Sequence, residues 1–130
     1  MDFKQQYGST DPKELAEWFE LNGAKFLVAP IDTVAFRNET LRVFRVGDIQ
    51  EEGLNERSAY EVMELECGIK AKAVLLNWES VKNGDEDVPY SINTAKAYLI
   101  NYDEFRNWVD ERANELVVKR HKHANDAKKK

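Results

Sequence analysis

Cysteine is almost missing from this 130-residue sequence, in which Cys67 is the only one. A single cysteine excludes an intrachain disulfide and a zinc site built from the cysteines of one chain, so a reducing cytoplasm is the expected setting. Long apolar runs are missing as well: none approaches the roughly 20 residues that span a bilayer, and the polar start has no secretory signal pattern. We therefore expect a protein that is neither secreted nor membrane-spanning.

Recognisable catalytic motifs are also missing. The sequence contains no phosphate-binding P-loop, no Rossmann glycine pattern, no His-Glu-x-x-His and no Gly-x-Ser-x-Gly. Cys67 has Glu64 and Glu66 beside it and no nearby histidine. Acidic neighbours raise the pKa of a thiol, which favours a buried structural cysteine over a nucleophile. We expect no catalytic residue, and hence a protein that is not an enzyme.

Metal ligands are few and poorly spaced. The only histidines, His121 and His123, lie in a basic segment without a carboxylate or cysteine at ligand spacing, so a solvated tail is favoured over a metal site. The run Asp85-Glu86-Asp87 lacks the alternating oxygens, central glycine and terminal glutamate of a calcium loop, and a solvated turn explains it better. We expect no metal and no cofactor.

Charge is distributed unevenly along the chain. The net charge is −5, but residues 119–130 hold six basic residues and one acid, which leaves 13 bases and 23 acids in residues 1–118. The acidic body would repel nucleic acid, and the tail alone could supply only weak, salt-sensitive contacts to it. Basic residues also suit the end of a helix, so nucleic-acid binding is the less favoured use of this tail.

Apolar residues make up 42% of the chain and aromatic residues 11%, which is enough to fold one domain of ordinary size. Turn-forming residues with little apolar periodicity occupy the first dozen positions. We expect a flexible lead-in at residues 1–15, a single helical domain with an N-terminal hairpin at residues 16–118, and a basic mobile tail at residues 119–130.

The first half of that domain begins with a turn signal. Asn22-Gly23 stands between two strand-like runs, which predicts a β-hairpin at residues 16–29. A helix over residues 12–19 is the alternative for the first part of this segment, because proline is tolerated in a first helical turn. Helical spacing of apolar residues then predicts a helix at about residues 33–45.

The longest predicted helix follows, with Asn55 as a possible cap. Gly68 lies in its middle and is unfavourable there unless it permits a kink or a close helix crossing. Its apolar stripe consists of Met63, Cys67, Ala71, Val74, Trp78 and Val81.

Two further helices are predicted near the C-terminus. Ser91 can cap a short helix over residues 92–99, and Asn101 with Glu104 fits a capping box that opens a last helix. The last helix should fray after Val118. Together these elements predict a mainly α fold with a small N-terminal β-hairpin (α+β), a compact helical domain built around one long central helix.

Several segments of this pattern resemble a known family. Residues 73–81 (AVLLNWESV), the Val-Pro-Tyr-Ser sequence at residues 88–91 and residues 103–109 (DEFRNWV) are similar to the tail assembly chaperones of long-tailed, siphovirus-type bacteriophages and prophages. The hairpin and Phe36-Arg37-Asn38 also fit the layout of that family. The resemblance covers about residues 16–118 and follows helix ends and a loop, without a catalytic signature.

The resemblance implies a chaperone in the host bacterial cytoplasm that binds the tape measure protein, helps to recruit tail tube subunits and is not retained in the virion. Such a protein would also associate with itself along its partner. The alternative is a small structural or adaptor tail component, or a regulatory binding protein whose basic tail contacts nucleic acid. Amphipathic aromatic residues anchor interfaces, and the candidates for protein contact, each of which could equally belong to the core, are Trp78, Tyr90, Tyr98, Tyr102 and Trp108.

The codons of the terminal Lys128-Lys129-Lys130 suggest how the gene is translated. Lysine codons make this stretch a purine run that is nearly all adenine, on which a ribosome can slip. The resemblance implies a rarer, longer form of the protein made by such a translational frameshift. Terminal lysines that merely aid solubility are the alternative.

Overall fold

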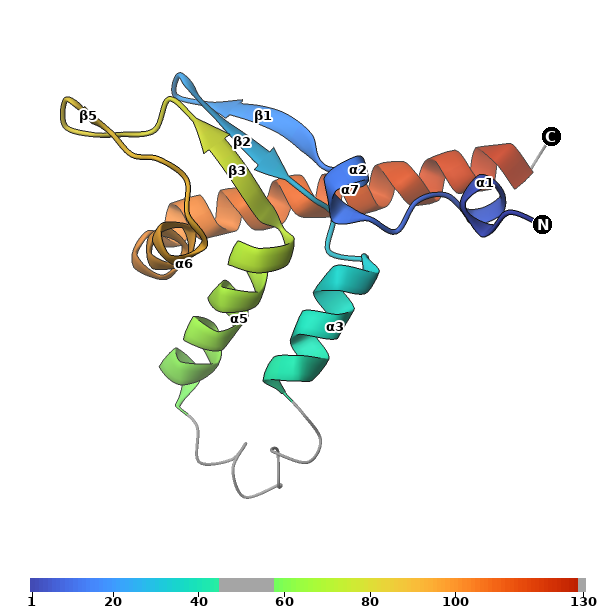
Figure 1. Cartoon of the computed structure of the whole chain (residues 1–130), viewed down its shortest axis with the longest axis horizontal. Coiled ribbons are helices and arrows are strands. Elements are labelled where there is room, and N and C mark those ends of the chain that lie inside the picture. Colours follow the sequence, from blue (N-terminus) through green and yellow to red (C-terminus); the bar gives the residue numbers. More distant parts are fainter. Residues whose placement is uncertain (45–57, 129–130) are drawn as a thin grey trace.

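Figure 1 shows the computed structural model of the chain, which describes residues 1–44 and 58–128, with side chains described as far as Lys122. The elements, in chain order, are α1 (Phe3–Tyr7), α2 (Pro12–Leu15), β1 (Glu17–Leu21), β2 (Ala24–Val28), α3 (Val34–Val43), α5 (Ala59–Ala73), β3 (Leu75–Glu79), β4 (Lys82–Asn83), β5 (Glu86–Asp87), α6 (Ile92–Asn101) and α7 (Asp103–Lys128).

The predicted hairpin is present as β1 and β2. Asn22 and Gly23 form its turn with φ angles of 51° and 85°, the positive values that a tight hairpin turn requires and that asparagine and glycine tolerate. The helical alternative for this segment survives only as α2, which starts at Pro12 and ends before the strand. The local sequence therefore determines this part of the fold.

The predicted fold class is wrong, because the structure is a mixed arrangement of helices and strands. β1, β2 and β3 form a three-stranded antiparallel sheet in that order. The expected long central helix supplies both α5 and β3, since the helix ends at Ala73 and the next residues pair with β2. A short apolar run fits both helical and strand periods, and here pairing with β2 decides the outcome.

An irregularity in the pairing explains why β3 looked helical in the sequence. Leu75 and Trp78 are three residues apart and are both buried, whereas regular strand residues at that spacing point to opposite faces. The register between β2 and β3 shifts between Leu27 and Val28. This bulge-like shift lets both side chains point into the core.

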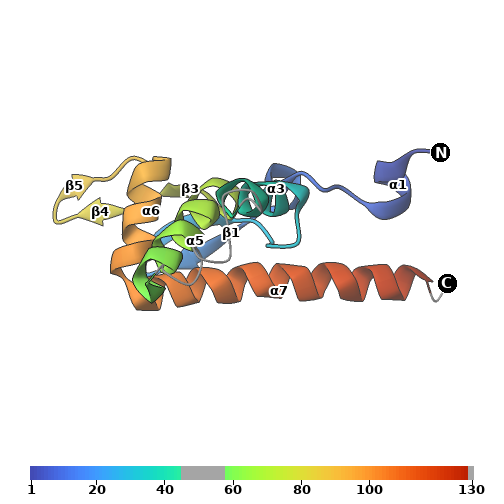
Figure 2. The same cartoon turned by 90° about the horizontal axis from the view of Figure 1, so that it is seen from below.

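The core lies between one face of the sheet and the helices. α7 runs behind the strands in Figure 1, and Figure 2 shows it along one side of the molecule. Phe26 is the central contact, with ring centroids 5.0 Å from Phe105 and 5.6 Å from Trp108. The buried cluster consists of Phe26, Val28, Cys67, Ala71, Val74, Leu75, Trp78, Ala95, Leu99, Val109 and Ala113.

The start of α6 was predicted correctly, but the start of α7 was not. The Ser91 hydroxyl accepts a 3.0 Å hydrogen bond from the Thr94 amide and caps α6. Asn101 still belongs to α6, because the next amide, that of Tyr102, donates to the Tyr98 carbonyl at 3.0 Å. The proposed capping box at Asn101 is therefore wrong, and α7 begins at Asp103.

The two ends of the chain contain more helix than expected. α7 continues to Lys128, beyond the end near Val118 that the sequence predicts. Lys119 and Arg120 help to hold this part of α7, because they form ion pairs with Glu17 and Asp32 at 3.2 and 2.6 Å. The lead-in contains α1 and α2, and the mobility of both ends stays a prediction.

Candidate protein-interaction surfaces

Two of the five predicted contact residues are part of the core. Trp78 is only 4% exposed, and its indole Nε1 donates a 2.8 Å hydrogen bond to the Val88 carbonyl. The half-buried Tyr90 donates its hydroxyl to the Leu75 carbonyl at 2.7 Å, with the Ala71 carbonyl 3.1 Å away. Burial raises the pKa of the Tyr90 hydroxyl. Both residues stabilise the fold, and Trp78 presents almost no surface to a partner.

Trp108 is half-buried and already has several partners. Its ring lies edge-on to Phe26 and Phe19, with centroid distances of 5.6 and 6.4 Å. The Arg112 guanidinium lies 5.6 Å above the ring in a cation–π arrangement. Trp108 therefore joins α7 to the sheet, and a partner protein would find little of its ring free.

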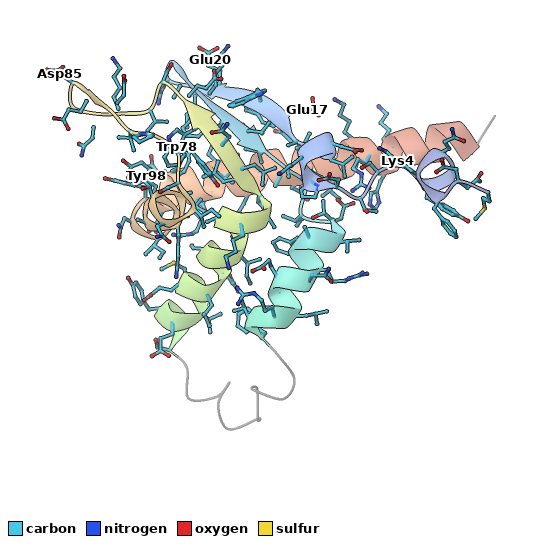
Figure 3. The ribbon with its side chains drawn as sticks, viewed as in Figure 1. Lys4, Glu17, Glu20, Trp78, Asp85 and Tyr98 are labelled. Atoms are coloured by element: carbon cyan, nitrogen blue, oxygen red, sulfur yellow. The ribbon has the colours of Figure 1, made fainter. Side chains whose placement is uncertain are left out.

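Tyr98 and Tyr102 extend the same aromatic cluster to the surface (Figure 3 labels Trp78 and Tyr98). Trp78 stacks on Tyr98 with centroids 5.6 Å apart, and Tyr98 meets Tyr102 edge-on at 5.8 Å. Tyr102 is 59% exposed. The structure thus brings the predicted residues into one cluster, but among the five only Tyr102 presents most of its ring to solvent.

The sheet has one face that the described helices do not cover. We call it the open sheet face and define it by Trp18, Glu20, Lys25, Leu27 and Glu79, which alternate with the buried residues of the three strands. Trp18 is 44% exposed and pairs with Leu27 on β2. Glu20, Lys25 and Glu79 form one row across the strands. A shallow cavity of about 330 Å³ lies against this row and Trp18.

The sequence did not identify Trp18 as a contact candidate, although the hairpin turn already determines which residues share its face of the sheet. The Asn22-Gly23 turn fixes the register, which places Trp18 opposite Leu27 and on the other face from Phe19. Which of these faces is covered depends on α7 and β3, and neither can be placed by the local pattern of the hairpin.

The first 15 residues carry a second apolar surface, and we call this segment the N-terminal arm. Asp2 caps α1 by accepting a 2.9 Å hydrogen bond from the Lys4 amide. One turn of helix then places Phe3 and Tyr7 side by side, with ring centroids 5.8 Å apart. Their exposed fractions are 68% and 69%. A cavity of about 570 Å³ lies beside them, lined by residues 3–4, 7–11 and 14.

A polar contact joins the N-terminal arm to the end of α7. Arg120 donates to the Ser9 carbonyl at 3.3 Å and also pairs with Asp32. The imidazole Nε2 of His121 lies 3.3 Å from the same Asp32 carboxylate. The pairs with Asp32 hold the end of α7, whereas the contact to the arm is the hydrogen bond from Arg120 to Ser9, which contributes about 0.5–1.5 kcal/mol net.

The remaining described residues that the sequence singled out are a buried cysteine and a group of exposed carboxylates. Cys67 is fully buried, as predicted, and burial raises the pKa of its thiol. Asp85, Glu86 and Asp87 are exposed around the β4–β5 hairpin, and the His123 side chain lies outside the described part of the chain. Within the described residues, no group of three or more His, Cys, Asp or Glu side chains could hold a metal ion. None of the helices described has both the length and the apolar composition needed to cross a bilayer.

The fold and these surfaces define a small α+β protein that exposes aromatic side chains on an open sheet face and on an N-terminal arm. A family model described as YdaY prophage protein matches residues 31–130, from the segment before α3 through α7. The chain therefore belongs to this family of prophage proteins. No curated protein and no solved structure matches the chain.

Proposed function

We propose that the chain is a tail assembly chaperone of a siphovirus-type prophage. It binds the tape measure protein in the cytoplasm of the bacterial host, helps to recruit tail tube subunits, and leaves before the virion is complete. Two findings support this proposal: the chain belongs to a prophage protein family, and residues 16–118 resemble tail assembly chaperones. The function requires binding and no chemistry.

The exposed aromatic pair on the N-terminal arm is the observation that carries the proposal. A chaperone of a long helical partner needs apolar surface that can cover the partner's apolar stripe. Phe3 and Tyr7 offer such a surface four residues apart on one helical turn. Because no residue of α1 is buried, α1 can move onto a partner without opening the core. Tyr102 and Trp18 provide further exposed rings that a partner could contact.

Co-expression tests this proposal directly. The tape measure gene of the same prophage is expressed alone and together with this chain, and the soluble tape measure protein is quantified in both cases. We expect the tape measure protein to be soluble only in the presence of the chain and to co-purify with it. A tape measure protein that is equally insoluble in both experiments would contradict the proposal.

The composition of purified virions separates the chaperone from its alternatives. The proposal expects no peptides of residues 1–118 in the particle. Finding the chain there in a fixed ratio to the tail tube protein would favour a structural or adaptor component. A chaperone made in two lengths is also part of the proposal, with the longer form arising by a frameshift at the codons of Lys128-Lys129-Lys130.

A further inference from the structure

The two ends of the molecule carry opposite charge. One end holds the open sheet face and the β4–β5 hairpin, where Glu20, Glu79 and the exposed acids at positions 85–87 outnumber Lys25 and Lys82. The other end holds the last turns of α7 with the described cations Lys119, Arg120 and Lys122, and the sequence of residues 119–130 contains six basic residues and one acid. In Figure 1 the hairpin and the C-terminus lie at opposite ends of the long axis.

α7 packs against the face of the sheet opposite the open sheet face, and its Lys119 pairs with Glu17 at the start of β1. α7 starts beside α6, close to the hairpin, and runs away from it along the molecule (Figures 1 and 2). A helix of 26 residues is about 39 Å long at 1.5 Å per residue. It also packs on the sheet through Val109 and Ala113, which fixes its direction. A contact between the end of α7 and the open sheet face must therefore join two molecules.

The open sheet face has the chemistry to accept a basic side chain. Its cavity of about 330 Å³ is lined by Trp18, Phe19, Glu20, Lys25 and Glu79, which include one indole and two carboxylate side chains. A lysine or arginine can lay its aliphatic part on an indole and direct its charge to carboxylates. Lys25 stands in the same row and neutralises only part of the acidic charge.

The end of α7 presents a matching surface. Val118 is 59% exposed, and Lys122 is exposed one helical turn further on. Residues four apart lie on the same side of a helix, so an apolar side chain and a cation project together. Lys119 is also exposed, although it pairs with Glu17 of its own chain.

We infer that the end of α7 from one copy docks on the open sheet face of a second copy, in a head-to-tail arrangement. Each copy then keeps one free sheet face and one free helix end, so the contact does not close and copies add in a row. The inference deepens the proposed self-association, but it needs no tape measure protein. Its failure in the experiments below would leave the tape measure proposal standing, and failure of the co-expression test would leave this docking untouched.

Sedimentation of the purified chain at two salt concentrations tests the docking. Screening shortens the reach of charges from about 30 Å at 0.01 M salt to about 3 Å at 1 M. We expect a mass that rises with protein concentration above 15.1 kDa at 0.01 M salt and returns to the monomer value at 1 M. A monomer mass at every concentration in low salt would overturn the inference.

Charge-reversed variants then identify the two surfaces. The face variant carries Glu20→Lys and Glu79→Lys, and the tail variant carries Val118→Glu and Lys122→Glu. All four side chains are exposed, and circular dichroism verifies the fold of each variant. We expect each variant to be monomeric alone and a mixture of the two to associate again, because each retains the surface that the other lacks.

A matched control excludes a general effect of net charge. Glu66→Lys with Glu104→Lys makes the same charge change as the face variant at exposed positions on α5 and α7, outside the open sheet face. We expect this control to associate like the wild type. Self-association of the face variant in the absence of the tail variant would contradict the head-to-tail arrangement. A mixture of the two variants that stays monomeric would also contradict it.

Discussion

The indole nitrogen of Trp78 donates a 2.8 Å hydrogen bond to the carbonyl oxygen of Val88. This bond ties β3 to the segment that leads into α6. The same indole stacks on Tyr98 of α6 at 5.6 Å and meets Tyr90 edge-on at 5.1 Å. One side chain thus connects the sheet, the segment after the small hairpin and a helix.

Trp78→Ala should therefore destabilise the protein severely. Removing a buried tryptophan leaves a cavity and costs about 3–5 kcal/mol of unfolding free energy. Trp78→Phe keeps part of the ring but leaves the Val88 carbonyl without its donor, so we expect a smaller loss, to which the hydrogen bond contributes about 1–2 kcal/mol. Urea unfolding followed by circular dichroism measures both values. A loss below about 1 kcal/mol for the alanine variant would show that Trp78 is not a core residue.

Tyr90 should make stability depend on alkaline pH. Burial raises the pKa of its hydroxyl above the ordinary value of 10.0, so the unfolded chain loses this proton before the folded chain does. The stabilisation is complete below pH 10 and is lost as the pH rises from there through the folded-state pKa. Tyr90→Phe should be less stable at pH 7 by about 1–2 kcal/mol. Its unfolding free energy should fall less steeply between pH 10 and pH 11 than that of the wild type, and parallel curves would contradict the assignment.

Gly68→Ala should stabilise α5. No tight crossing needs glycine here, because an added Cβ would lie 3.5 Å from Cε of Lys96, an ordinary contact. Alanine in a helix interior is favoured over glycine by about 0.5–1 kcal/mol. Thermal unfolding should show a higher Tm for the variant. A lower Tm would indicate that α6 cannot accommodate the extra methyl group.

Two local signals predicted parts of the fold correctly, whereas the local capping-box signal at Asn101 did not. Asn22-Gly23 identified the hairpin, and Ser91 identified the start of α6. Local patterns failed where a distant partner decided. No sequence signal near Leu75 or Trp78 indicates that this segment will pair with β2. The bulge in that pairing gives the two buried residues a spacing that is typical of a helix.

The contact surface was less accessible to prediction than the fold. Aromatic residue type alone selected Trp78, Tyr90 and Trp108, which pack in or against the core. Exposure separates a contact residue from a core residue, and exposure depends on the packing of α7 against the sheet. Phe3 and Tyr7 were passed over because they lie in a segment that reads as a lead-in without apolar periodicity.

The frameshift proposal predicts two forms of the protein in induced lysogens. Mass spectrometry of the cells should find peptides of the 130-residue form and, at lower abundance, peptides that cross a junction near Lys128. Changing the lysine codons from AAA to AAG keeps the protein sequence and should remove the longer form. Detection of only the 130-residue form before any codon change would contradict the proposal.

Binding of a soluble helical segment of the tape measure protein to the chain tests the central claim most directly. Isothermal titration compares the wild type with the double variant Phe3→Ser and Tyr7→Ser. The matched control is Tyr60→Ser, which removes a ring that is 56% exposed on α5. Truncating an interface anchor costs about 2 kcal/mol or more, so we expect the Kd of the double variant to rise at least about tenfold and that of the control to stay unchanged. An unchanged Kd for the double variant, or no binding by the wild type, would contradict the account.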